Sequence, residues 1–108
     1  MPLSDDKRNF TPVFMIKTIK HKGLRLLWEG EKGYRLPADQ VERIEDMLEV
    51  IDSAVYVPAD FEFYKSWKIH PLKGNLKGYW SLTVKENWRV IFCFDREHAY
   101  NLDYIDYH

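Results

Sequence analysis

The sequence has one cysteine, no strong excess of either charge and no long apolar run. With Cys93 alone, the 108-residue chain has no disulfide framework, which is typical of the reducing cytoplasm. No apolar stretch reaches the roughly 20 residues that a membrane-spanning helix needs, and nothing resembles a secretory signal. We therefore expect a cytoplasmic domain without membrane contact.

Hydrophobic and aromatic residues are plentiful. They make up 45% and 16% of the chain, which excludes an intrinsically disordered protein. A single domain of this length buries about two-thirds of its unfolded surface. Residues 1–14 are polar at first and contain Pro2 and Pro12. We expect a weakly ordered extension over 1–14 and one folded domain over 15–108.

The net charge of −1 conceals two segments of opposite sign. Residues 29–52 hold eight acidic and three basic side chains, a net charge of −5, whereas residues 64–89 hold six basic and one acidic, a net charge of +5. The basic segment attracts phosphates. It also carries aromatic residues, and cations beside aromatic faces suit single-stranded RNA, although many aromatics also fill a core.

The hydrophobic spacing predicts two helices. Leu24, Leu27 and Trp28 share one face of a short helix that ends near Gly30. A longer helix begins after Pro37, and its apolar stripe recurs every three or four residues: Val41, Ile44, Leu48, Ile51, Val55. We expect this stripe to pack on a sheet.

Four segments have the composition of β-strands. A β-prone run at 13–20 precedes the helices, and alternating runs at 79–85, 88–95 and 98–106 follow an irregular connection over 58–71. A strand, two helices and an antiparallel meander make an α+β domain. Cys93 lies inside the second alternating run, so we expect a buried strand residue rather than a nucleophile.

Two segments carry groups suited to acid–base chemistry. The last six residues of the sequence combine histidine, tyrosine and aspartate, and His108 can exchange protons near neutral pH. In the second segment, His70 precedes a loop in which Leu-Lys-Gly occurs twice, with Lys73 and Lys77 available to bind phosphate. Each alone is a weak signal, since a surface strand and a lysine-rich loop are common.

Together these groups are able to cleave RNA without a metal. A base takes the proton of the ribose 2′-hydroxyl, whose oxygen attacks the adjacent phosphorus, and an acid protonates the departing 5′-oxygen. Cations stabilise the charge on the phosphoryl oxygens. DNA lacks the 2′-hydroxyl, so this reaction is confined to RNA.

Several motifs in order resemble the HigB-type toxins, plasmid-maintenance killers of the RelE/ParE superfamily. The resemblance covers nearly everything from Met15 onward and rests on five segments: MIKTIKHKGL (15–24), HPLKG (70–74), YWS (79–81), NWR (87–89) and DYH (106–108). It implies a RelE/ParE-like fold and a type II toxin that cuts messenger RNA on the ribosome. It also implies a HigA-type antitoxin with a helix-turn-helix as partner.

The resemblance also implies site residues. Proton transfer and its orientation are carried over to His70, Asp106, Tyr107 and His108, and phosphate stabilisation to Lys73 and Arg89, with Lys85 as a weaker candidate. His21 and His98 match no catalytic position and are expected at the surface. Which histidine is the base and which the acid stays open.

Three alternatives to RNA cleavage are a gyrase poison, an RNA-binding module and a metal site. A non-catalytic gyrase poison of the ParE kind, or an RNA-binding module on the same fold, would not need the two histidines. A metal site would have to combine His70, His98, Asp103, Asp106 and His108, but no histidine of this set has a partner at the i, i+3 or i, i+4 spacing of a metal-binding helix. We expect no metal and no cofactor.

Overall fold

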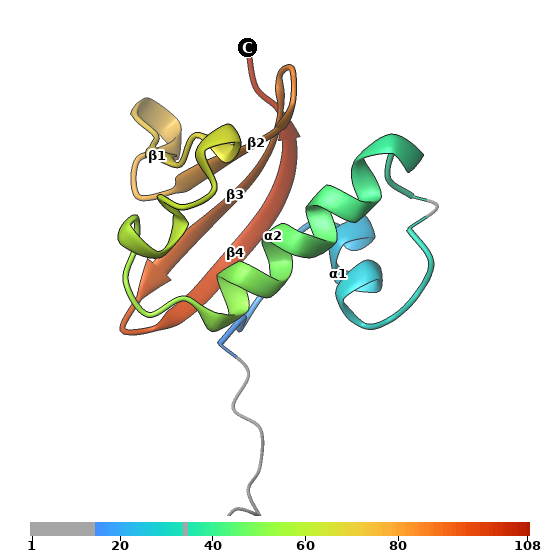
Figure 1. Ribbon diagram of the computed structural model, residues 1–108, viewed down its shortest axis with the longest axis horizontal. Coiled ribbons are helices and arrows are strands. Elements are labelled where there is room, and N and C mark those ends of the chain that lie inside the picture. Colours follow the sequence, from blue (N-terminus) through green and yellow to red (C-terminus); the bar gives the residue numbers. More distant parts are fainter. Residues whose placement is uncertain (1–14, 34) are drawn as a thin grey trace, which may run out of the picture.

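A computed structural model describes residues 15–33 and 35–108, in which two helices pack on a four-stranded antiparallel sheet (Figure 1). The strands lie across the sheet in chain order: β1 (His70–Pro71), β2 (Trp80–Lys85), β3 (Trp88–Asp95) and β4 (His98–Asp106). The helices are α1 (Lys22–Trp28) and α2 (Val41–Ser53). Short 3-10 turns occupy the connections: Ala38–Gln40, Ala59–Phe61, Lys65–Trp67 and Gly74–Leu76. The α+β class is as predicted.

The three long strands agree with the sequence pattern to within one residue. Each hairpin is closed by residues with positive φ, Glu86 at the first and Arg96 and Glu97 at the second. The short strand β1 was not predicted, because the connection over 58–71 has no alternating pattern. His70 pairs with Ser81 and Pro71 with Trp80, so the end of this connection forms the edge of the sheet.

Helix α2 ends earlier than its apolar stripe suggests. Ile44, Leu48 and Ile51 are buried as predicted, but the helix stops at Ser53, and Val55 is 41% exposed. The reason is local, since a carboxylate oxygen of Asp60 accepts hydrogen bonds from the backbone N–H groups of Val55 and Tyr56. These bonds hold residues 55–58 in a non-helical turn, so helix α2 does not continue.

The predicted N-terminal strand is not present as a regular strand among residues 15–20. Ile16 and Ile19 instead form two isolated parallel bridges, to Ala99 and Leu102 of β4. Between these bridges β4 bulges at Asn101, whose φ is +56° and whose N–H bonds to the hydroxyl of Thr18. The bulge interrupts a continuous ladder. Residues 13 and 14 of the predicted strand, and the predicted extension over 1–14, lie outside the described residues.

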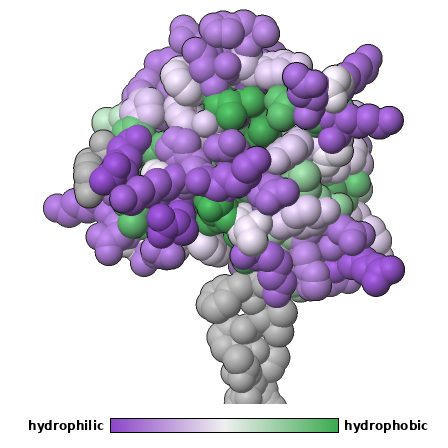
Figure 2. Space-filling model, turned by 180° about the vertical axis from the view of Figure 1, so that it is seen from behind, coloured by the Kyte–Doolittle hydropathy of each residue, from purple (hydrophilic) through white to green (hydrophobic). Residues whose placement is uncertain are grey.

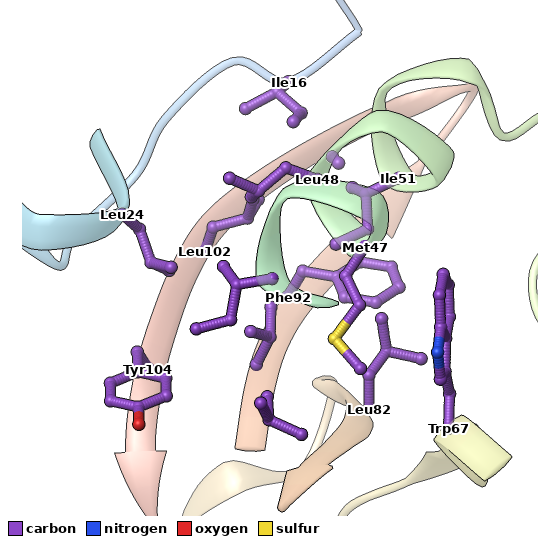
Figure 3. Packing of buried hydrophobic residues seen from close by; sticks show 14 of the residues in the cluster. Ile16, Leu24, Met47, Leu48, Ile51, Trp67, Leu82, Phe92, Leu102 and Tyr104 are labelled. Atoms are coloured by element: carbon purple, nitrogen blue, oxygen red, sulfur yellow. The ribbon is translucent and has the colours of Figure 1, made fainter. Parts of the chain in front are cut away.

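The core lies between the helices and one face of the sheet. Figure 3 shows Leu48, Met47 and Ile51 of α2 beside Phe92 of β3 and Leu82 of β2. At the edge of this core Tyr104 is buried; it stacks on Trp88 with ring centroids 4.8 Å apart and donates its hydroxyl hydrogen to Gln40 at 2.5 Å. Burial raises the pKa of Tyr104 to about 12, so its phenol stays protonated.

We call the sheet face turned away from α1 and α2 the outer face. Pairing register places His70, Ser81, Ile91 and Asp103 in one row across this face. Seen from behind, the molecule is mostly hydrophilic, with hydrophobic residues in separate areas (Figure 2). In residues 15–33 and 35–108 there is no helix with the length and hydrophobicity needed to traverse a bilayer.

Candidate active site

The C-terminal residues are held against the turn between β2 and β3. The backbone N–H of Tyr107 donates to the carbonyl of Asn87 at 2.8 Å, and the Asn87 amide lies 3.3 Å from Nδ1 of His108. Nε2 of His108 is 3.7 Å from a carboxylate oxygen of Asp106, which is within ion-pair distance when the ring is protonated. The imidazole is therefore held from two sides, although 73% of the side chain is exposed.

Arg89 brings a cation to the same turn. Its guanidinium donates to the carbonyl of Glu86 at 2.5 Å and approaches that of Trp88 at 3.4 Å. In the described part of the chain its Nε is buried and has no hydrogen-bond partner. A buried donor without an acceptor is costly. Because Nε is shielded from solvent, a phosphate would have to bind through the other nitrogens of the guanidinium. The turn over residues 86–89 thus joins a held imidazole to a partly unsatisfied guanidinium.

His70 and its loop form a second group on the sheet edge. Nδ1 of His70 lies 2.8 Å from the carbonyl oxygen of Lys68. Because a carbonyl only accepts, Nδ1 carries the hydrogen, and a neutral His70 has its free lone pair on Nε2. Lys73 and Lys77 flank the 3-10 turn after β1, and both are exposed. This group offers a proton acceptor beside two accessible cations.

The structure does not bring His70 into contact with the C-terminal residues. In register, His70 aligns with Asp103 across the sheet, three residues before Asp106. This places it about 14 Å across three strand spacings and about 10 Å along β4 in a flat sheet. A substrate that meets both groups must cross the outer face toward the β2–β3 turn.

Lys85 is directed away from the other candidates. Its ammonium lies 2.5 Å from a carboxylate oxygen of Asp39, in the 3-10 turn that precedes α2. This hydrogen bond raises the pKa of Lys85 and lowers that of Asp39. Of the phosphate-binding candidates, Lys85 is the one whose charge is matched by a carboxylate within the described residues.

The remaining candidate groups have other surroundings. His98 is exposed as expected, but His21 caps α1, because its Nδ1 accepts from the N–H groups of Gly23 and Leu24. Its ring also packs edge-on against Tyr104. Cys93 is half-buried rather than buried, and burial raises the pKa of its thiol. Across residues 15–33 and 35–108, no three His, Cys, Asp or Glu side chains converge as a metal-binding group.

Asn87 is the residue of this site that reasoning from types and spacing missed. The available signal was its place next to Trp88 and Arg89 in a conspicuous hairpin turn. We expect Asn87→Ala to reduce the cleavage rate about two- to tenfold, because one net hydrogen bond that orients His108 is lost. The loss should appear in kcat, accompanied by a changed pH–rate profile, and not in KM.

The matched control is Asn75→Ala, which removes an exposed asparagine from the loop after β1. Equal losses in the two variants, or an unchanged pH profile in Asn87→Ala, would contradict the positioning role.

Comparisons with known proteins agree on one kind of protein. A family model described as "RelE-like toxin of type II toxin-antitoxin system HigB" matches residues 17–108. The chain is 48% identical over 95 residues to "Endoribonuclease HigB" of Proteus vulgaris, covering 87% of this chain and 100% of that protein. It is 32% identical over 95 residues to "Toxin HigB-1" of Vibrio cholerae serotype O1, covering 87% and 98%.

A solved structure is similar in fold. The chain superposes on a chain of the "YoeB-YefM complex from Staphylococcus aureus" with a TM-score of 0.54 and 20% identity, covering 90% of this chain and 99% of that one. At this identity the likeness concerns the fold alone.

Proposed function

The chain belongs to the RelE-like toxins of HigB type II toxin–antitoxin systems, and from this premise we propose that it is an endoribonuclease that cleaves messenger RNA on the ribosome. The observation that carries the proposal is the turn over residues 86–89. In it Asn87 contacts the imidazole of His108, which also lies near Asp106, and the guanidinium of Arg89 donates to the backbone of the same turn. Acid–base and phosphate-binding groups are thus on one exposed surface.

The proposed reaction needs one base and one acid. Nε2 of His70 takes the proton of the 2′-hydroxyl, because Nδ1 is engaged with the carbonyl of Lys68. Since the base and the acid act on one phosphodiester, this assignment requires the edge segment that carries His70 to move toward the C-terminal residues when RNA binds. The 2′-oxygen attacks the phosphorus, the bond from phosphorus to the 5′-oxygen breaks, and the protonated His108 gives its proton to that oxygen. The products are a 2′,3′-cyclic phosphate and a 5′-hydroxyl.

The other site residues support these proton transfers and stabilise the charge on the phosphate. Asp106 pairs with the protonated ring of His108, and Asn87 orients it. Arg89 and Lys73 bind the non-bridging phosphate oxygens, and Lys77 attracts the flanking backbone. Lys85 contributes less, because its charge is matched by Asp39. Tyr107 contributes through its backbone, whose bond to the carbonyl of Asn87 holds the C-terminal residues against the turn.

The open form of the site supports dependence on the ribosome. His108, Lys73 and Lys77 are all exposed, so the protein offers few walls to hold a flexible RNA strand. Much of the rate of such a reaction comes from orientation of the reacting groups. On the proposal, the ribosome supplies this orientation by presenting messenger RNA in a fixed path.

An antitoxin partner follows from the same family membership. The solved structure with a similar fold carries the name of a two-protein complex, and the family model names a toxin–antitoxin system. We propose a HigA-type antitoxin with a helix-turn-helix as the cognate inhibitor. The acidic helix α2 and the basic group Lys73, Lys77 and Arg89 are two regions of opposite charge that offer such a partner different docking sites.

The test is to add the protein to programmed ribosomes and to map the ends of the messenger RNA. We expect cuts at fixed positions within codons, products with cyclic phosphate and 5′-hydroxyl ends, and slow cutting of the same RNA without ribosomes. Intact messenger RNA together with inhibited DNA supercoiling would instead favour the gyrase-poison function. Ribosome binding without cleavage would favour the RNA-binding module.

A further inference from the structure

Lys20 reaches across the outer face of the sheet to Tyr79. The ammonium of Lys20 donates to the hydroxyl of Tyr79 at 3.1 Å and lies 5.6 Å from the centre of its ring. Lys20 follows the bridge that joins the N-terminal segment to β4, whereas Tyr79 precedes β2. Two segments on different sides of β3 are therefore connected by one side-chain contact.

The charge of Lys20 is not matched by a close carboxylate. Within residues 15–33 and 35–108, no carboxylate lies at ion-pair distance from its ammonium, and its partner is a neutral phenol. The hydrogen bond to Tyr79 raises the pKa of Lys20, with a smaller contribution from Asp103. Lys20 thus remains a fixed, exposed cation, unlike Lys85, which is paired with Asp39.

The position of Lys20 distinguishes it from the catalytic groups. Its backbone N–H bonds to the carbonyl of Leu102, four residues before Asp106 on β4. Four residues of a strand span about 13 Å. The side chain of Lys20 extends to Tyr79, which precedes the Trp80–Phe92 pair, and not toward Trp88 and Asp106. Its ammonium is therefore placed for a different phosphate from the one at Arg89 and His108.

We propose that Lys20 and Tyr79 form a second phosphate-binding subsite for single-stranded RNA. Lys20 binds a backbone phosphate that flanks the scissile one, and Tyr79 holds the ammonium in place. This inference rests on the proposed function for the identity of the ligand. The subsite adds a contact with RNA that the catalytic residues do not provide, and this contact affects RNA binding rather than the chemical step.

Binding is measured with a short single-stranded RNA whose 2′-hydroxyls are methylated, so that it cannot be cleaved, at a series of salt concentrations. One phosphate contact on a single strand contributes about 0.7 to the slope of log K against log salt. We expect Lys20→Met to lower this slope by about 0.7 and to weaken binding about fivefold at 0.1 M salt. Tyr79→Phe should weaken binding with the slope retained.

Two further variants separate binding from folding. Lys17→Met removes an exposed lysine from the same segment and should leave affinity and slope unchanged. Lys20→Arg keeps the cation and should retain the slope. A slope unchanged in Lys20→Met, a loss of equal size in Lys17→Met, or a loss in Lys20→Arg as large as in Lys20→Met would each overturn the subsite.

Cleavage on ribosomes provides the second readout. We expect Lys20→Met to raise KM with kcat retained, because the contact is made equally in the ground state and the transition state. If the wild-type protein binds the methylated RNA with the Lys20-dependent slope but cuts no messenger RNA, the proposed function fails and the subsite stands. If it cuts messenger RNA and Lys20→Met binds and cuts like the wild type, the subsite alone fails.

Discussion

His108→Ala is expected to reduce the rate of messenger-RNA cleavage by about 10²- to 10⁴-fold, the range that a positioned proton donor contributes. The fold should persist, because the side chain is 73% exposed and its contacts are limited to Asn87 and Asp106 in the described structure. The measurement is the single-turnover rate on programmed ribosomes, with thermal unfolding of both proteins recorded in parallel.

The control for this prediction is His98→Ala. His98 is exposed at the opposite end of β4, so the substitution removes an imidazole of the same kind far from Asn87. Its cleavage rate should equal that of the wild type. Undiminished activity in His108→Ala would remove His108 from the mechanism, and an equal loss in both variants would point to a general effect of removing surface imidazoles.

Phe92→Ala is expected to lower the free energy of unfolding by about 3–5 kcal/mol. Phe92 is fully buried in the centre of β3, and its ring packs against Phe61 with centroids 5.6 Å apart. Removing the ring takes away its burial and leaves a cavity between the sheet and α2, which rigid neighbours close only in part. Equilibrium unfolding in urea measures the change.

Phe63→Ala is the matched control. Phe63 is 86% exposed and contacts the ring of Tyr64, so its loss should change the free energy of unfolding by less than about 0.5 kcal/mol. A destabilisation of Phe92→Ala no larger than that of Phe63→Ala would show that the core described between α2 and the sheet does not stabilise the protein in solution.

The long strands were predictable from the sequence because their larger hydrophobic residues alternate. Trp80, Leu82 and Val84 alternate with more polar residues, and Val90 and Phe92 continue the core face in β3. The burial of Ser81 and Ile91 on the outer face was not predicted from this pattern. Alternation fixes which residues face the core, and short polar turns fix where the strands end. The stripe of α2 was predictable for the same reason, with a period of 3.6 in place of 2.

The structure differs from the sequence-based predictions where a single contact, local or long-range, decides the conformation. The carboxylate of Asp60 accepts a hydrogen bond from the backbone of Val55, and helix α2 ends before that residue. His70 belongs to a strand without an alternating sequence, because its backbone pairs with Ser81. His21, expected only at the surface, is half-buried as the cap of α1. None of these contacts leaves a periodic signal, because each involves one or two residues and not a repeating pattern.

The sequence by itself determined the α+β class, the bounds of β2, β3 and β4 to within one residue and, through its resemblance, the family of toxins to which the chain belongs. It also named the candidate site residues, whose chemistry follows from their types. Only the tertiary structure decided how they are grouped: His108 against Asn87, Lys85 against Asp39, and Lys20 across the outer face on Tyr79. Residue types and periods are local properties of a chain, whereas these contacts depend on the register and crossing of strands that are distant in sequence.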